Sequence, residues 1–128
     1  MTRVNLVNPK DLYDQHLLSE HREIKRIPNV IKSGKYVYKD IPSKYILGKG
    51  HVKFFYDKLK FLHNRYVSLY KECLNRSFKV ENYEESFFNL PAELYNDYEP
   101  KSEDIELNKK RLTEKYKPNF YRYYGEIK

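Results

Sequence analysis

Cysteine is almost absent from this chain of 128 residues, and tryptophan is missing altogether. The single thiol, Cys73, cannot form a disulfide within the chain, and it excludes a zinc site built from several cysteines. Because disulfides form in oxidising compartments, a chain that lacks them fits a reducing setting. We therefore expect a cytoplasmic protein.

Long hydrophobic runs are also missing. No apolar stretch approaches the roughly 18 residues that a membrane span requires, and the first residues, Met1 to Asn5, lack the apolar region of a secretory signal. We therefore expect neither a membrane segment nor a secretory leader. Leu, Ile, Val and Phe are still frequent enough to form a small hydrophobic core.

The sequence contains no glycine-rich phosphate loop and no nucleophile elbow. Its four histidines, His16, His21, His51 and His63, show no recognised metal-site spacing. We therefore expect no metal and no cofactor.

Positive charge is present in excess and is unevenly distributed. The chain has 25 Lys and Arg against 18 Asp and Glu, a formal net charge of +7. The local balance is +9 over residues 22–65, −4 over residues 77–101 and +5 over residues 109–128. Two basic regions thus flank an acidic connector. Such clusters are typical of proteins that bind polyanions, most often nucleic acid; the alternative is a solvated basic surface that only aids solubility.

The first predicted helix begins at Asn8, a residue type that caps helices and is followed here by Pro9. It should end near Arg26, because a proline at position 28 disfavours the α conformation of the preceding residue. An apolar stripe with helical spacing predicts the buried face of this helix. The opposite face is mainly polar and carries Gln15, His16, Ser19, Arg22, Glu23 and Arg26, with Leu12 as its apolar member.

The strongest helical periodicity lies over residues 51–76, where apolar residues recur every three or four positions up to Cys73. Cys73 on this stripe is expected to be a buried, inert thiol. A third helix is predicted over residues 103–116, with Ile105, Leu112 and Tyr116 facing inward. Residues 29–50 are expected to form loops with short helical turns at most.

No segment alternates in the manner of a sheet, so we expect an all-α fold. The prediction is a single compact domain over residues 1–128, with three main helices, irregular loops and an aromatic C-terminal tail. The stripe of the 51–76 helix resembles a coiled-coil seam, but a core within one domain fits it better, and we expect a monomer.

The first helix carries the pattern with most chemical potential. Arg22 and Arg26 lie one turn apart, with Glu23 between them on the same face. Two guanidinium groups would hold this carboxylate ionised, and the same groups can bind phosphates in a bidentate manner. The alternative is a surface salt-bridge ladder that contributes less than about 1 kcal/mol.

The N-terminus offers a nucleophile. Thr2 is small, so we expect Met1 to be removed, which would expose the α-amine of Thr2. Such an amine has a reference pKa of about 7.7–8.0, against about 10.4 for lysine, and a neighbouring cation such as Arg3 lowers it further. A neutral amine is competent for imine chemistry.

These residues also carry a resemblance to a known family. Four blocks occur in order along the chain: Thr2–Leu6; Asp14–Leu17 with Glu20, Arg22, Glu23 and Arg26; Ile46–Val52 and Phe54–Leu59 with Glu72–Leu74; and Tyr121–Gly125. Together they resemble the phage-type pyrimidine-dimer DNA glycosylase/AP lyase family. Phe120 stands where that family often has Trp, and His21 stands where it has an aromatic residue.

The resemblance implies an all-α enzyme that cuts DNA at UV-induced cyclobutane pyrimidine dimers. By that resemblance Thr2 is the nucleophile, which forms an imine with the deoxyribose, and Glu23 is the catalytic carboxylate that supports β-elimination. The implied substrate is double-stranded DNA with pyrimidine dimers or abasic sites. The residues implied to bind DNA or shape the site are Arg3, Gln15, His16, Arg22, Arg26, Arg111, Lys115, Tyr121, Tyr123 and Tyr124.

Two alternatives remain open on the sequence. One is a non-catalytic basic helical module that binds DNA or RNA through phosphates and aromatic residues. The other is an enzyme of the same chemistry that acts on other lesions or on plain abasic sites.

Overall fold

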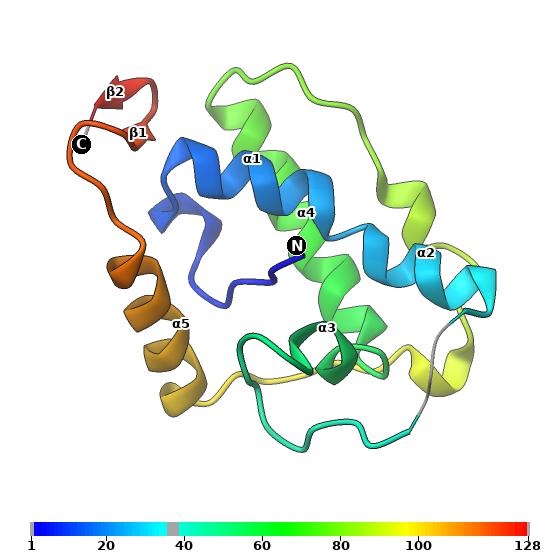
Figure 1. The fold of residues 1–128 in the computed structure, drawn as a ribbon. Coiled ribbons are helices and arrows are strands. Elements are labelled where there is room, and N and C mark those ends of the chain that lie inside the picture. The colour runs from blue at the N-terminus through cyan, green and yellow to red at the C-terminus, as the bar shows by residue number, and fades with distance from the viewer. Residues whose placement is uncertain (1, 36–38, 128) are drawn as a thin grey trace.

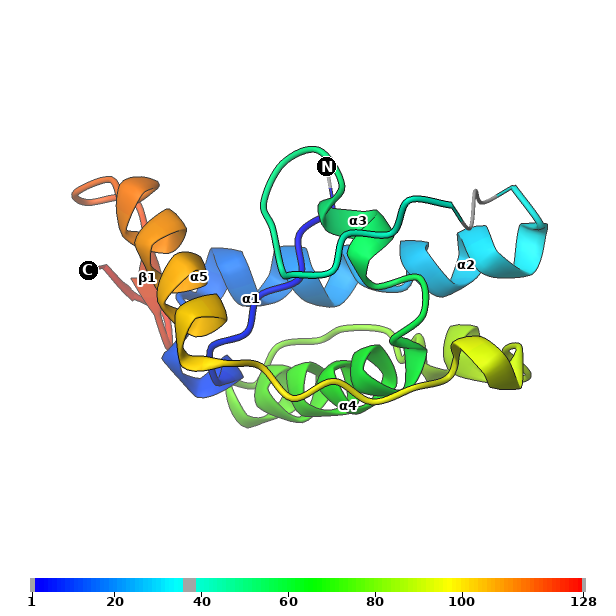
Figure 2. The ribbon, with the colours of Figure 1, turned by 90° about the horizontal axis from the view of Figure 1, so that it is seen from below.

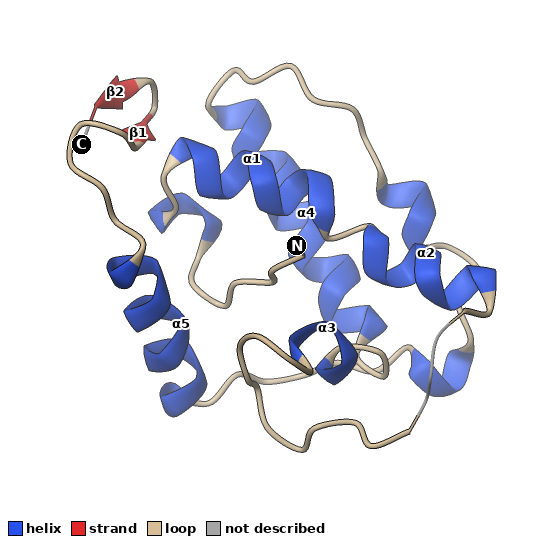
Figure 3. Ribbon diagram, viewed as in Figure 1, coloured by secondary structure: helices blue, strands red, loops and turns tan. Residues whose placement is uncertain are grey.

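The computed structural model describes residues 2–35 and 39–127, and this part of the chain is mainly α-helical (Figures 1 and 3). The main prediction for the fold class is therefore confirmed. Its helices are α1 (Asp14–Glu23), α2 (Arg26–Ser33), α3 (His51–Phe54), α4 (Leu59–Asn75) and α5 (Ser102–Glu114). Short 3₁₀ helices lie at η1 (Pro9–Asp11), η2 (Glu84–Phe87) and η3 (Ala92–Leu94).

The predicted helix over residues 8–26 is wrong in its extent. The chain instead forms η1, then α1, then α2, because Leu12 and Tyr13 adopt extended backbone angles between η1 and α1. Pro28 does not end a helix here, since it occupies the third position of α2. At that position the missing N–H would have had no partner within the helix, so the proline is tolerated.

The predicted helix over residues 51–76 is divided. Lys58 has non-helical backbone angles and separates the single turn of α3 from α4. The apolar stripe nevertheless faces the core, with Val52 half-buried and the remaining members fully buried: Phe55, Leu59, Leu62, Tyr66, Leu69 and Cys73. Burial raises the pKa of the Cys73 thiol to about 11, which agrees with an inert thiol.

The third predicted helix is present as α5, but its inner face is more polar than predicted. Ile105 and Leu112 are half-buried and Tyr116 is exposed, whereas Asp104 and Asn108 are buried. The inward position of Asn108 matters because its side chain binds the N-terminal segment, as described below.

The C-terminal tail departs from the all-α prediction. Strands β1 (Arg122–Tyr123) and β2 (Glu126–Ile127) form a small antiparallel hairpin, in which Tyr123 pairs with Glu126. Its two-residue turn consists of Tyr124 and Gly125, both with positive φ, as a type I′ turn requires. This local hairpin carries no alternating pattern long enough to be seen in the sequence.

The helices form two layers. Figure 2 shows α1 and α2 on one side and α4 on the other, with α5 across one end. The core between them is formed by buried apolar residues from the N-terminal segment through to Leu94. Residues 2–7 run beside α1 from the level of α3 and the loop that precedes it towards the level of α4 (Figure 2). Within the described residues, no helix has the length and apolar character needed to cross a membrane.

Candidate active site

A hollow of about 250 Å³ lies between α1, the N-terminal segment, α5 and the C-terminal tail. Five of the predicted site residues meet there, although they come from three distant parts of the sequence. The residues that line it are Arg3, Asn5, His16, Ser19, Glu20, Glu23, Leu112, Lys115 and Tyr121. Thr2 is half-buried and directly precedes Arg3. The removal of Met1 concerns a residue outside the described part of the chain.

Two cations, Arg3 and Lys115, line this hollow, and a third, Arg111, lies close enough to both to affect their pKa. Burial and then the charge of Arg111 lower the pKa of Arg3. The pKa of Lys115 is lowered too, first by the charge of Arg3, then by burial and by Arg111. Among the described residues, the buried Nη1 of Arg3 has no hydrogen-bond partner. Arg111 also makes a long ion pair with Glu114, at 3.7 Å, whereas Arg3 and Lys115 line the hollow beside an unpaired donor, which makes it suited to an anion.

His16 contributes a neutral ring to the hollow. Burial lowers its pKa, and the charges of Lys115 and Arg3 lower it further. The ring stacks on Tyr121 with centroids 4.6 Å apart. Its buried Nε2 has no partner in the described part of the chain, so it can still make a hydrogen bond to a ligand.

Glu23 supplies the carboxylate of the site at the C-terminal end of α1. Its side chain is 15% exposed, and its Oε2 lies 3.5 Å from Nη2 of Arg22, which is 59% exposed. Arg26, the first residue of α2, is exposed and makes no ion pair with Glu23 in the described structure. Of the two guanidinium groups predicted to flank Glu23, only that of Arg22 pairs with it among the described residues, at a long distance.

Gln15 binds the C-terminal tail in this structure. Its Nε2 donates to the carbonyl of Phe120 at 2.7 Å, and its Oε1 accepts from the N–H of Arg122 at 2.9 Å. The sequence suggested a contact with DNA for Gln15, and that role stays a prediction.

The tail tyrosines also bond to the protein itself. The hydroxyl of Tyr121 donates to the carbonyl of Lys115 at 3.1 Å, and that of Tyr123 donates to the carbonyl of Lys10 at 2.8 Å. The hydroxyl of Tyr124 donates to Oε2 of Glu72 at 2.9 Å. Tyr121 faces the hollow, whereas Tyr123 and Tyr124 fasten the hairpin outside it.

Sequence reasoning missed the arginine that organises this attachment. The guanidinium of Arg76 is fully buried and pairs with Asp14 at 2.9 Å and Glu72 at 2.8 Å. It also lies under the rings of Tyr123 and Tyr124, 4.8 and 4.7 Å from their centroids. Burial alone would lower the pKa of Arg76, but the hydrogen bonds that it donates to both carboxylates outweigh this effect and raise the pKa.

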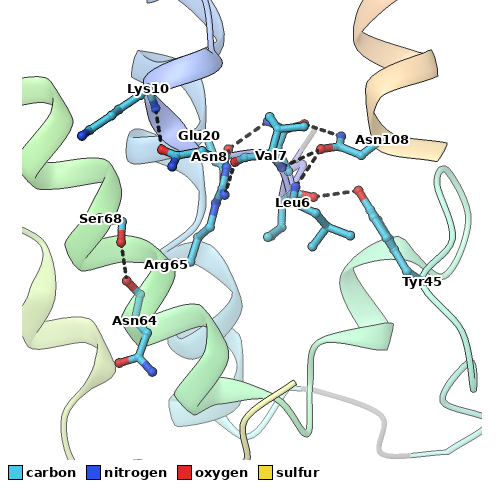
Figure 4. A network of polar contacts seen from close by, with 12 residues as sticks. Leu6, Val7, Asn8, Lys10, Glu20, Tyr45, Asn64, Arg65, Ser68 and Asn108 are labelled. Atoms are coloured by element: carbon cyan, nitrogen blue, oxygen red, sulfur yellow. Dashed lines mark hydrogen bonds and ion pairs between the residues drawn. The ribbon is translucent and has the colours of Figure 1, made fainter. Parts of the chain in front are cut away.

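The extended N-terminal segment is held by another group of residues that the sequence did not identify (Figure 4). Asn108 accepts hydrogen bonds from the N–H groups of Leu6 at 2.7 Å and Val7 at 3.3 Å. Arg65 donates to the carbonyl of Val7 at 2.5 Å and makes a two-pronged ion pair with Glu20, at 2.7 and 2.9 Å. The sequence could have pointed to Asn108, because it is a polar residue at a core position in the apolar spacing of α5.

No group of three or more potential metal ligands occurs among residues 2–35 and 39–127. Comparison with known protein families gives a match over residues 1–85 to the family described as pyrimidine dimer DNA glycosylase. That range supplies Arg3, His16 and Glu23 among the residues that line the hollow. Lys115 and Tyr121, which also line the hollow, lie outside the matched range.

Proposed function

The chain belongs to the pyrimidine dimer DNA glycosylase family, and we propose that it excises cyclobutane pyrimidine dimers through the α-amine of Thr2. Membership of this family makes the chain a DNA repair glycosylase with DNA as its substrate. The observation that carries the finer proposal is the hollow next to Thr2, which the carboxylate of Glu23 lines together with the cations Arg3 and Lys115.

The proposed reaction begins with the neutral Thr2 amine attacking C1′ of the deoxyribose of the 5′ pyrimidine. A C–N bond forms to the amine, the glycosidic bond breaks, and the base leaves with its electron pair and takes up a proton. The amine loses its protons as the sugar ring opens to an imine. Loss of a proton from C2′ then eliminates the 3′ phosphate, which cuts the strand, and water releases the enzyme.

Glu23 is proposed to stabilise the positive charge that develops on the sugar and on the iminium. A carboxylate acts best in this way when it is fixed and largely removed from water, and the Glu23 side chain is 15% exposed on the rigid helix α1. The same carboxylate is proposed to assist removal of the C2′ proton.

The cations of the hollow are proposed to bind the phosphates beside the lesion. Arg3, Arg111 and Lys115 repel one another in the free protein, so an anion relieves this repulsion on binding. Arg22 and Arg26 are exposed and are proposed to extend this phosphate contact along α1 and α2. Enzymes of this kind reach their target by extruding a base from the duplex, here proposed to be the adenine opposite the lesion.

The other residues predicted to contact DNA are proposed to do so around the hollow. The exposed faces of Tyr123 and Tyr124 are proposed to lie against the duplex, and His16 with Gln15 to line the site. A monomer is proposed, because the apolar stripe of α4 is buried within the chain.

The decisive test is trapping of the imine with borohydride on duplexes that contain a dimer or an abasic site. Protein shown to lack Met1 is expected to form a covalent adduct at Thr2, whereas N-terminally acetylated protein is not. Glu23→Gln is expected to retain DNA binding and to lose strand cleavage by about 100-fold or more. Cleavage by the acetylated protein at the parent rate would contradict the amine mechanism.

A panel of lesions separates the remaining alternatives. Binding with a steep salt dependence but no adduct on any lesion would identify a non-catalytic basic module. Adducts on abasic sites without action on dimers would identify the same chemistry with another substrate.

A further inference from the structure

Val4, two residues after Thr2, is held by both of its backbone polar groups. Its N–H donates to Nε2 of His51 at 2.8 Å, and its carbonyl accepts from the hydroxyl of Tyr45 at 2.9 Å. Val4 is fully buried, and Tyr45 and His51 are almost so. Both partners come from the segment that precedes and begins α3, far from Val4 in the sequence.

These bonds define the protonation state of His51. Because Nε2 accepts a hydrogen bond, it carries no proton, and Nδ1 then donates to the carbonyl of Ile46 at 2.8 Å. Burial lowers the pKa of His51; the Ile46 carbonyl and Glu20 raise it, and Arg3 lowers it. The neutral tautomer that accepts from Val4 is therefore the form present near neutral pH.

The loop before α3 is shaped to bring the two side chains onto Val4. Gly50 directly precedes His51 with φ of 89°, a left-handed conformation that favours glycine. A Cβ at this position would lie 2.9 Å from Cδ1 of Ile46 and 3.2 Å from Cγ of Pro42. The close packing around Gly50 thus fixes the position of His51, the first residue of α3.

We propose that His51 and Tyr45 are positioning residues that hold the Thr2 amine at the Glu23 carboxylate. This inference rests on the proposed function. Two residues span at most about 7 Å of chain, so fixing Val4 confines the amine to a small volume beside Arg3. An amine held near its target reacts far faster than a mobile one, and a misplacement of about 1 Å can cost 100-fold in rate.

The rest of the segment has its own attachments, which makes the idea testable. Asn108 and Arg65 hold Leu6 and Val7 independently of Val4. Loss of the Val4 bonds is therefore expected to loosen the first residues while the fold and the DNA-binding surface remain.

The experiment compares Tyr45→Phe, His51→Gln and His51→Leu with the parent, all shown to lack Met1. Single-turnover borohydride trapping is measured on a saturating abasic duplex, together with the Kd for that duplex and the melting temperature. His51→Leu is expected to slow trapping 10- to 100-fold and Tyr45→Phe several-fold, with Kd within twofold of the parent. His51→Gln keeps an acceptor and is expected to recover part of the rate.

A matched control is His63→Gln. His63 also bonds through both ring nitrogens, to Tyr95 at 2.7 Å and to Glu84 at 2.8 Å, but it lies outside the hollow. This variant is expected to trap at the parent rate.

The outcomes separate the two proposals. Parent-like trapping by both His51→Leu and Tyr45→Phe would overturn the positioning role alone. So would a loss of rate that is matched by an equal loss of DNA affinity in every folded variant. A parent protein that forms no adduct would overturn the proposed function, and the positioning role with it.

Discussion

Two groups of cations in this protein differ in whether a carboxylate neutralises them: the buried Arg65 and Arg76, and the half-buried Arg3 with the exposed Lys115. In the interior, the Arg65 and Arg76 side chains are paired with carboxylates and with backbone carbonyls. At the hollow, Arg111 lies close enough to Arg3 and Lys115 to lower the pKa of both, and Arg3 lowers that of Lys115 further. The paired arginines of the interior stabilise the fold. The cations at the hollow repel one another, and a bound anion would relieve that repulsion.

The interior pairs show what a completed network requires. Arg65 meets Glu20 through two nitrogens, and Glu20 also accepts from Nδ2 of Asn5 at 2.8 Å. A buried ion pair of this kind is retained only when its remaining polar atoms are also satisfied. The hollow fails that condition, since Nη1 of Arg3 and Nε2 of His16 have no partner among the described residues.

The largest expected effect comes from breaking the interior network. Arg76→Met would leave Asp14 and Glu72 buried without their counter-charge and would detach the rings of Tyr123 and Tyr124. We expect the free energy of unfolding to fall by about 3–5 kcal/mol. Urea denaturation measures this change.

The control for this substitution is Arg122→Gln in the exposed hairpin. Its guanidinium makes one long contact, 3.4 Å to the carbonyl of Gly125, and it is expected to change stability by less than about 0.5 kcal/mol. Equal losses in the two variants would contradict the distinction between paired interior charge and surface charge.

The sequence predicted the helical wall of the hollow well. The helical spacing on α1 placed His16, Ser19 and Glu23 on one face, and all of them line the hollow. It did not predict the break between α1 and α2, where Ile24 and Lys25 keep helical backbone angles and Ile24 and Ile27 are both buried, as their shared stripe would also require in one continuous helix. Local periodicity therefore predicts the polar face of α1. It does not predict the residues that α5 and the tail add to the hollow, because tertiary packing brings them there.

The attachments of the N-terminal segment were beyond sequence reasoning for a different reason. His51 and Asn108 contact residues 47 and about 100 positions away, and nothing in local spacing encodes such pairs. The same holds for Gln15 and the tyrosines of the tail, whose hydrogen bonds close a long-range contact between α1 and the hairpin.

Three buried or half-buried histidines make the stability of the fold depend on pH. Burial is the main cause that lowers the pKa of His16, His21 and His51 in the folded state. The unfolded chain therefore binds protons more readily, and the stability present above pH 6.5 is lost as the pH falls towards the folded pKa values. Each histidine contributes at most about 1.4 kcal/mol per pH unit.

Urea denaturation between pH 7.5 and pH 5.5 measures this loss, in a window above the titration of most carboxylates. His21→Phe removes one of the three groups, since His21 is buried against Tyr66 with an Nε2-to-hydroxyl distance of 3.1 Å. The slope of stability against pH is expected to decrease in this variant. An unchanged slope would show that His21 does not contribute.

The smallest effect on stability is expected from Lys115→Gln. This variant also tests most sharply the contrast between the paired arginines of the interior and the cations at the hollow. Removing this charge relieves its repulsion with Arg3 and Arg111, so the free energy of unfolding should stay within about 0.5 kcal/mol of the parent or rise slightly. DNA binding should nevertheless weaken, and the slope of log K against log salt should decrease by about 1, as for one lost phosphate contact. A titration of duplex binding over several salt concentrations measures this slope. If the slope is unchanged, Lys115 does not contact phosphate, and the crowded cations of the hollow have another role.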